Sequence, residues 1–256
     1  MDWKGKTILL TGASSGIGEA LAVALAKKGA TLGLLARREE LLVELAERCS
    51  AVGGKALALP CDVVDADSIK LAANRFRDAF GHIDIMIANA GIGGNDSLTR
   101  AYDPASVKKL IDINLLGAVN SIHAVIGDMI ERKKGHLVAI SSLAGFRGLP
   151  KSAAYSSSKA AMTAFFESVR LDNAKNGIDV TIIQPGFIKT PLTSGRSNKM
   201  PFIMELDDAI PYFISAIENK RKFAAFPITL ALIVKLGSIM PAWLYDRVAG
   251  KARFRE

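Results

Sequence analysis

Short apolar runs alternate with longer amphipathic stretches along most of this chain. The run at residues 7–10 is followed, at residues 19–28, by a stretch in which apolar residues recur with a helical period. The same alternation recurs about every 25 residues as far as residue 183. It predicts strands at residues 7–10, 30–36, 55–60, 83–88, 136–140, 178–183 and 223–226, and helices at residues 19–28, 39–52, 65–80, 104–133 and 152–176.

Strands that alternate with helices are joined by right-handed crossovers and form a parallel sheet with helices on both faces. We therefore predict an α/β fold with a doubly wound parallel sheet, Rossmann-type, in a three-layer αβα arrangement. The 256 residues suit one large domain with a single core. We expect one domain over residues 1–256, in which residues 191–218 cover the substrate and residues 223–256 form an apolar and basic extension.

A glycine-rich turn lies between the first predicted strand and the first helix. Its sequence, TGASSGIG at residues 11–18, has the spacing GxxxGxG, which is related to the dinucleotide-binding fingerprint GxGxxG. Glycines let the backbone approach a ligand closely, and the free N–H groups at the start of a helix attract phosphate. The turn predicts nucleotide binding, and the alternative is an ordinary strand-to-helix turn.

The end of the second strand indicates which nucleotide binds. In this kind of fold an acidic residue there binds the adenosine ribose, whereas an arginine suits the 2′-phosphate of NADP. Ala36 ends the strand, and Arg37 and Arg38 follow it. A charge-assisted bond from arginine to phosphate contributes about 1.5–3 kcal/mol. We therefore expect NADPH to be preferred over NADH, and the alternative is a solvated arginine pair at the start of the next helix.

The sequence YSSSK at residues 155–159 places a phenol and an ammonium group four residues apart. Residues at this spacing share a helix face, so Lys159 can lie beside Tyr155. A nearby positive charge lowers the pKa of a phenol from about 10, so that the phenol can exchange protons near neutral pH. The pattern also occurs by chance on helices, so its meaning depends on the surrounding motifs.

Taken together, these stretches resemble the short-chain dehydrogenase/reductase family in its single-domain, NADP-preferring form. The resemblance covers residues 6–190 and rests on these motifs in the family's order: TGASSGIG, CDV, NAG, the asparagine of IDIN, SS, YSSSK and PGFIKT. Ser142 precedes Tyr155 by 13 residues, which is the family's spacing. Ala88 departs from the pattern, because many members have a second asparagine before NAG. We expect this change to alter local packing more than chemistry.

The resemblance implies a catalytic tetrad of Asn114, Ser142, Tyr155 and Lys159. In this tetrad Tyr155 donates a proton to the developing alkoxide while the nicotinamide gives a hydride to the carbonyl carbon, and Ser142 polarises the substrate oxygen. Lys159 lowers the pKa of Tyr155 and binds the nicotinamide ribose, and Asn114 holds a water that links the lysine to solvent. From the residues alone, Asn114 in its apolar setting is more typical of a hydrogen-bonding core residue.

The resemblance also implies contacts with the cofactor at the ends of the predicted strands. The residues expected at the adenosine and phosphate end are Gly12, Ser14, Ser15, Gly16, Ile17, Gly18, Arg37 and Arg38, and those expected at the adenine are Asp62 and Val63. The residues expected along the ribose are Asn89, Ala90 and Gly91. Those expected towards the carboxamide are Pro185, Gly186, Ile188 and Thr190, together with Tyr155 and Lys159. A homodimer or homotetramer is implied as well, in which the long helices around Asn114 and Tyr155 pair between subunits.

We therefore predict an NADP(H)-dependent oxidoreductase that interconverts a carbonyl and an alcohol on a hydrophobic small molecule. Methionine, phenylalanine and proline at residues 200–204 indicate an apolar pocket. The alternatives are an NAD-dependent enzyme, a reductase of lipid or acyl substrates at a membrane surface, and a catalytically silent nucleotide-binding protein. The intact tetrad argues against the last of these.

The carboxyl-terminal segment is apolar and basic. The chain has a formal net charge of +8, and from Asn219 onward eight basic residues stand against two acidic ones. The apolar run at residues 227–241 is interrupted by Lys235 and is shorter than the roughly 20 apolar residues that span a bilayer. The segment can lie in the interface of an anionic membrane, or it can be buried as a subunit contact or substrate lid. The basic residues form no recognised nucleic-acid-binding motif, so we expect no nucleic-acid partner.

The cysteines and histidines of the sequence are expected to have structural roles. Cys49 and Cys61 have no metal-ligand spacing and are expected to be free thiols in a reducing compartment. The three histidines are scattered through different elements, and we expect no metal site. An apolar strand starts at residue 7, which leaves no room for a signal peptide. We therefore expect a cytoplasmic protein, either free or peripheral at the inner face of a membrane.

Overall fold

A computed structural model describes residues 1–93, 102–194 and 200–250 of the chain. Within them, seven strands form one sheet in the order β3-β2-β1-β4-β5-β6-β7, and every neighbouring pair is parallel. The strand order turns back between β1 and β4, so the predicted doubly wound parallel sheet is confirmed. The strands are β1 (Thr7–Thr11), β2 (Thr31–Ala36), β3 (Lys55–Pro60), β4 (Ile85–Ala88), β5 (Gly135–Ile140), β6 (Ile178–Pro185) and β7 (Phe223–Phe226).

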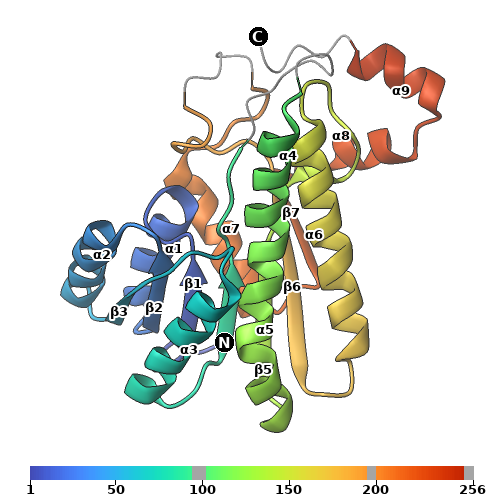
Figure 1. The fold of residues 1–256 in the computed structure, drawn as a ribbon. Coiled ribbons are helices and arrows are strands. Elements are labelled where there is room, and N and C mark those ends of the chain that lie inside the picture. The colour runs from blue at the N-terminus through green and yellow to red at the C-terminus, as the bar shows by residue number, and fades with distance from the viewer. Residues whose placement is uncertain (94–101, 195–199, 251–256) are drawn as a thin grey trace.

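Both faces of the sheet are buried, which explains why its central strands are apolar nearly throughout. Successive side chains of a strand point to opposite faces, so Ile8 and Leu10 of β1 contribute to one apolar cluster and Leu9 to another. Helices cover both clusters and complete the three layers (Figure 1).

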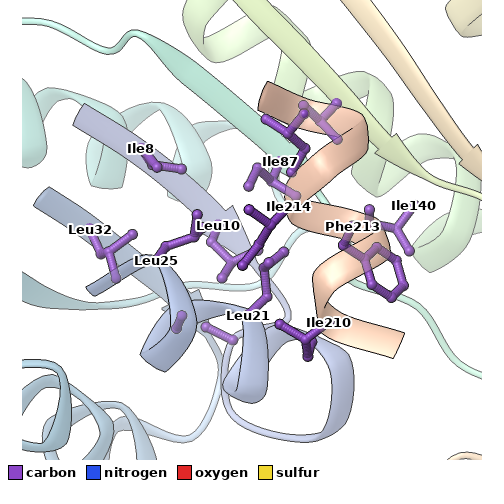
Figure 2. Packing of buried hydrophobic residues seen from close by; sticks show 14 of the residues in the cluster. Ile8, Leu10, Leu21, Leu25, Leu32, Ile87, Ile140, Ile210, Phe213 and Ile214 are labelled. Carbon is purple, nitrogen blue, oxygen red and sulfur yellow. The ribbon is translucent and has the colours of Figure 1, made fainter. Parts of the chain in front are cut away.

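Three helices cover the face that Ile8 and Leu10 share. They are α1 (Gly16–Ala26), α2 (Glu39–Ala51) and α7 (Leu206–Glu218). Figure 2 shows Leu21 of α1 and Phe213 of α7 in one cluster with the strand residues. The expected substrate cover included residues 206–218, and for α7 the structure corrects this expectation. The apolar face of α7 is buried in the core, because its apolar residues recur at helical spacing and pack beside α1.

The other face is covered by α3 (Ala66–Phe80), α5 (Gly117–Glu131) and α6 (Ala153–Asp172). The predicted helix at residues 104–133 has three parts, namely α4 (Pro104–Ile111), the π-helical turn η2 (Asp112–Leu116) and α5. Among the described residues, 104–131 form the one helical stretch that is long and apolar enough to cross a membrane. Ile122 and Met129 of α5 are buried against the sheet, as in the core helix of a globular domain.

The described part of the chain ends in two helices that the sequence pattern did not assign. α8 (Ile228–Ile239) and α9 (Ala242–Ala249) begin directly after Pro227 and Pro241, the two prolines that bracket the apolar run. The pair lies towards the top of Figure 1, on the side where the strands end. Residues 195–199 of the expected substrate cover and 251–256 of the expected extension lie outside the described residues.

Candidate active site

A cavity of about 1150 Å³ lies at the carboxyl ends of the strands. Its walls come from the loops that follow β1 to β6 and from α8 and α9. Open parallel sheets bind ligands at these ends, near the point where the strand order turns back. Most small-molecule pockets measure about 300–1,000 Å³, so this cavity is large enough for more than one small ligand.

The glycine turn after β1 brings backbone to the cavity wall. Gly12 and Gly16 have positive φ angles of 66° and 58°, which glycine adopts without strain. A Cβ on Gly12 would stand 2.7 Å from the Cα of Ala90, so the turn lies directly against the loop after β4. The turn residues that line the cavity are Gly12, Ser14, Ser15, Gly16 and Ile17.

Gly18 has a packing role in the structure. A Cβ there would stand 2.2 Å from the carbonyl oxygen of Gly12, so only glycine lets α1 pack this closely under the turn. Among the described residues that line the cavity, Gly18 is absent. Gly18 thus packs beneath the turn, and its expected contact with the cofactor stays a prediction.

Hydrogen bonds join the glycine turn to the loop after β4. The side-chain amide of Asn89 donates to the carbonyls of Thr11 and Gly12, at 2.9 and 3.2 Å. The hydroxyl oxygen of Thr11 accepts from the backbone N–H groups of Asn89 and Ala90, at 3.0 and 3.1 Å. Asn89, Ala90 and Gly91 also line the cavity. The loop that was expected along the ribose thus also holds the glycine turn in shape.

The two arginines after β2 are exposed at the rim of the cavity. Arg38 donates to the hydroxyl of Ser14 at 2.9 Å and to its carbonyl at 3.4 Å, and so connects the end of β2 to the glycine turn. Arg37 makes no such side-chain hydrogen bond within the described part of the chain. The two neighbours therefore differ, because one holds the turn and the other extends its charge towards the cavity rim.

The loop after β3 contributes Asp62 and Val63 to the cavity wall, where the adenine contacts were expected. The Asp62 carboxylate accepts from the backbone N–H of Val64 at 3.1 Å. From α5, the side-chain amide of Asn120 donates to the carbonyl of Val63 at 2.9 Å. These bonds fix the loop at the rim.

Lys159 is buried on α6 beside the cavity. Its ammonium donates to the carbonyl of Ile140 at 2.8 Å, where β5 ends, and lies 6.0 Å from the centre of the Tyr155 ring. Burial lowers the pKa of Lys159 to about 8. A Cβ on Gly91 would stand 3.5 Å from the ammonium nitrogen, so the loop after β4 lies within van der Waals reach of the lysine.

Ser142 and Tyr155 line the same cavity as Lys159. Ser142 follows β5 and precedes the short turn η3 (Leu143–Gly145), and its hydroxyl oxygen accepts from the N–H of Ala144 at 3.1 Å. Tyr155 lies in the first turn of α6, one turn before Lys159. The fold thus brings a hydroxyl, a phenol and an ammonium group together at the ends of β5 and α6.

Asn114 lies behind this group and does not line the cavity among the described residues. Its side-chain oxygen accepts from the N–H of Ile92 at 2.8 Å, and its amide donates to the carbonyl of Ile92 at 3.0 Å and to Ser158 at 3.1 Å. The residue is fully buried within the π-helical turn η2, a kind of turn that often marks functional sites. Asn114 therefore joins α6 to the loop after β4, and its expected water-holding role stays a prediction.

The loop after β6 carries the contacts that were expected near the carboxamide. Pro185, Gly186, Ile188 and Thr190 all line the cavity. The N–H of Thr190 donates to the hydroxyl of Thr193 at 3.0 Å, and this hydroxyl donates to the carbonyl of Ile188 at 2.8 Å, which closes the loop into a compact turn. These four residues therefore line the same cavity as Tyr155 and Lys159.

Arg147 and Tyr245 also line the cavity, and neither was among the predicted site residues. The guanidinium of Arg147 lies 3.8 Å from the centre of the Tyr245 ring and donates to the carbonyls of Gly237 and Met240, at 2.7 and 2.6 Å. The Tyr245 hydroxyl donates to the carbonyl of Gly148 at 2.7 Å. These contacts connect α8 and α9 to the loop that carries Ser142. No local motif marks either residue, so only the folded chain shows the pairing.

Both cysteines and His136 are buried. Cys49 and Cys61 are buried and free, and burial raises the pKa of their thiols to about 11 and about 12, so both are protonated at neutral pH. His136 bonds to Thr181 across the sheet at 2.8 Å, and burial lowers the pKa of His136 to about 4. Among the described residues no group of three or more His, Cys, Asp or Glu could hold a metal ion.

Comparison with protein families and relatives agrees with this geometry. A family model for short chain dehydrogenase matches residues 6–201. An uncharacterized oxidoreductase from Myxococcus xanthus (strain DK1622) is 39% identical over 248 residues, which cover 97% of this chain and 98% of the relative.

Two solved structures share the fold. A 3-ketoacyl-ACP reductase from Sinorhizobium meliloti 1021 aligns with a TM-score of 0.79 and 28% identity, over 89% of this chain and 99% of that one. A metagenomic short-chain oxidoreductase in complex with NADP aligns with a TM-score of 0.75 and 29% identity, over 88% of this chain and 96% of that one.

Proposed function

This chain belongs to the short-chain dehydrogenase/reductase family, and we propose that it is an NADP(H)-dependent oxidoreductase that interconverts a carbonyl and an alcohol on a hydrophobic small molecule. One observation carries the proposal. Ser142, Tyr155 and Lys159 line the same cavity as the glycine turn and Arg37. A proton donor, a group that polarises an oxygen and a nucleotide site therefore share one enclosed space.

In the reduction, Tyr155 donates the phenolic proton to the substrate oxygen. The ammonium of Lys159, 6.0 Å from the ring centre, stabilises the phenolate that remains, and in the reverse direction this phenolate accepts the proton. The oxygen of Ser142 already accepts from the N–H of Ala144, so its own O–H is available to donate to the substrate oxygen. Ser142 thereby orients and polarises the group that Tyr155 protonates.

The residues present fit NADP(H). The glycine turn exposes backbone N–H groups at the start of α1, and Gly12 and Gly91 keep the cavity free of side chains at points where a Cβ would contact the walls. Arg37 offers a positive charge for a 2′-phosphate at the rim, and the wall after β2 presents no acid in its place. NADP(H), when bound, supplies or accepts the hydride. That one similar structure is a complex with NADP supports this choice.

Apolar side chains support a hydrophobic substrate. Leu143 and Leu149 flank the cavity in the loop that carries Ser142, and Phe187 follows β6 on the other side. Leu230 and Val234 of α8 close the cavity from the carboxyl-terminal end. An acyl chain with a keto group fits this lining, and the similarity to a structure described as a 3-ketoacyl-ACP reductase supports that class.

The test is a fluorescence titration of the purified protein with NADPH and NADH in parallel, followed by a panel of hydrophobic ketones and 3-ketoacyl thioesters added to the NADPH complex. We expect tighter binding of NADPH and its oxidation by at least one compound. Tyr155→Phe is expected to lose turnover by a factor of about 10²–10⁴ while it binds NADPH nearly as well, since only the hydroxyl is removed.

Near-normal turnover by Tyr155→Phe would remove Tyr155 as the proton donor. Binding of neither nucleotide would overturn the proposed cofactor site at the glycine turn and Arg37. The homodimer or homotetramer and the cytoplasmic location stay predictions; sedimentation equilibrium and cell fractionation test them.

A further inference from the structure

Helix α8 is apolar on two opposite faces. Its inner face, which includes Leu230, Val234 and Gly237, lines the cavity. On the opposite side Ile228, Leu232, Leu236 and Ile239 are between 58% and 78% exposed. A helix that is apolar all round is normally buried all round, so this outer face lacks a cover within the described chain.

The exposed residues form one surface. Residues at positions i, i+4, i+8 and i+11 share a helix face, which is the spacing of Ile228, Leu232, Leu236 and Ile239. Trp243, 69% exposed on α9, adds a large aromatic ring next to the end of α8. We call these five residues the outer apolar surface. Exposed apolar residues that share one helix face mark a contact with a partner or a membrane.

Basic residues accompany the outer apolar surface. Lys235 and Arg247 are exposed on α8 and α9, and the sequence continues with Lys251, Arg253 and Arg255. Against them stand only Asp246 and Glu256 from residue 228 onward. Within the described residues, the surface therefore lies next to the exposed positive charges of Lys235 and Arg247.

The positive charge decides between two partners that could cover the outer apolar surface, namely a second copy of the chain and a lipid bilayer. A twofold contact opposes a surface with itself, so a second copy would bring Lys235 and Arg247 of both copies to one interface. An anionic bilayer instead offers negative headgroups to the basic residues and acyl chains to the apolar ones. Tryptophan is also typical of the level at which headgroups meet acyl chains.

We propose that the outer apolar surface lies in the interface of an anionic lipid bilayer, with Lys235 and Arg247 at the headgroups. Because the inner face of the same helix lines the cavity, α8 then separates the cavity from the lipid by one helix. The consequence, which rests on the proposed function, is that a hydrophobic carbonyl substrate dissolved in the bilayer reaches the active site past α8.

The test is flotation of the full-length protein with vesicles of phosphatidylcholine alone and with vesicles that also contain phosphatidylglycerol. We expect binding to the mixed vesicles at low salt and loss of that binding at high salt, because salt screens the basic residues. Leu236→Ser combined with Ile239→Ser is expected to weaken vesicle binding by about tenfold or more. Reversal of charge by Lys235→Glu with Arg247→Glu is expected to remove the preference for phosphatidylglycerol.

Leu71→Ser is the matched control, because Leu71 of α3 is 63% exposed and Leu236 is 62% exposed. This variant should float like the wild type. Circular dichroism establishes that each variant is folded. Tyr155→Phe should also float like the wild type, so a failure of the proposed chemistry and a failure of the membrane contact give different results.

Absence of flotation with both vesicle types overturns the proposal. Analytical ultracentrifugation without lipid provides the other decisive result. If Leu236→Ser with Ile239→Ser dissociates an oligomer that Leu71→Ser leaves intact, a second copy covers the surface and the membrane proposal is wrong.

Discussion

The ammonium nitrogen of Lys159 lies 6.0 Å from the centre of the Tyr155 ring, one turn along the same helix. The lysine is buried, and its ammonium donates to the carbonyl of Ile140. Burial makes its charge costly and lowers its pKa from 10.5 to about 8. The cation that we propose supports proton transfer by Tyr155 is thus close to losing its own proton at mildly basic pH.

We expect kcat/KM for carbonyl reduction to fall as the pH rises through about 8, because neutral Lys159 no longer stabilises the phenolate of Tyr155. The measurement is a pH profile of kcat/KM, which reports the ionisation of the free enzyme. An unperturbed lysine, with a pKa of 10.5, would keep the profile flat across this range, and a flat profile would contradict the role given to the charge.

Loss of folding stability through the titration of Lys159 does not explain such a fall in kcat/KM. Between pH values of about 8 and 10.5 the unfolded chain holds a proton on Lys159 that the folded chain has released. The contribution of Lys159 to the free energy of unfolding therefore rises with pH between about 8 and 10.5 and is lower below pH 8. Recovery of activity after return to neutral pH is the control for irreversible damage.

Arg37→Asp should weaken NADPH binding by about ten- to a hundredfold, because one charge-assisted bond to phosphate contributes about 1.5–3 kcal/mol. NADH has no 2′-phosphate and should bind at least as well as before. Parallel fluorescence titrations measure the ratio of the two affinities. An unchanged ratio would show that another group reads the phosphate.

Arg38→Ala is the matched comparison for Arg37→Asp. Arg38 bonds to Ser14 in the glycine turn, which both cofactors would use. The variant should therefore weaken NADPH and NADH by a similar factor of a few, as expected for the loss of one exposed hydrogen bond. A change of the ratio in Arg38→Ala but not in Arg37→Asp would assign the phosphate to Arg38.

The fold was predictable because its signals are local. β1 and β2 are buried on both faces, so they read as short continuous apolar runs, and the stretch between them is long enough for the one helix α1. The glycine turn and the pair Tyr155 and Lys159 are also local patterns. Since carboxyl ends of parallel strands meet at one edge, such patterns suffice to place most candidate residues around one cavity.

Contacts between distant segments were not predictable. α7 and α8 are both apolar, yet α7 is buried in the core and α8 covers the cavity, and periodicity alone does not tell which surface each meets. The partners of Asn114 lie 22 and 44 residues away, so its embedded position was invisible in the sequence. Arg147 bonds to carbonyls 90 and 93 residues further along.

Arg147→Ala should loosen α8 and α9 without unfolding the domain. It removes two hydrogen bonds to the end of α8 and the contact with the Tyr245 ring. Hydrogen exchange in residues 228–249 should accelerate by about tenfold, since roughly 1–2 kcal/mol of local stability is lost, while the strands exchange as before. KM for a hydrophobic substrate should also rise, because α8 lines the cavity.

Arg147→Lys should restore slow exchange only in part, because an ammonium can donate to both carbonyls but lacks the planar group that stacks on the Tyr245 ring. Tyr245→Phe keeps the ring and loses only the bond to the Gly148 carbonyl, so its effect should be smaller. Equal effects of Arg147→Ala and Tyr245→Phe would show that the hydroxyl, not the guanidinium, holds the two helices.

His136 should make stability depend on pH on the acidic side. It is buried in β5, where it contacts Thr181, and burial lowers its pKa from 6.5 to about 4. Asp179 raises this pKa and Lys220 lowers it, and these two side chains pair with each other at 2.6 Å. Burial is the largest of the three effects, so the folded protein keeps His136 neutral.

Between pH values of about 6.5 and 4 the unfolded chain binds a proton on His136 that the folded chain does not. The stability is therefore full above about 6.5 and is lost as the pH falls towards 4, by about 3 kcal/mol from this group. Denaturant unfolding at a series of pH values measures the loss. His136→Gln should show a loss smaller by about that amount, because glutamine does not titrate. His82→Gln is the control at an exposed histidine, and a pH dependence in His136→Gln that matches the wild type would assign the acid sensitivity to other groups.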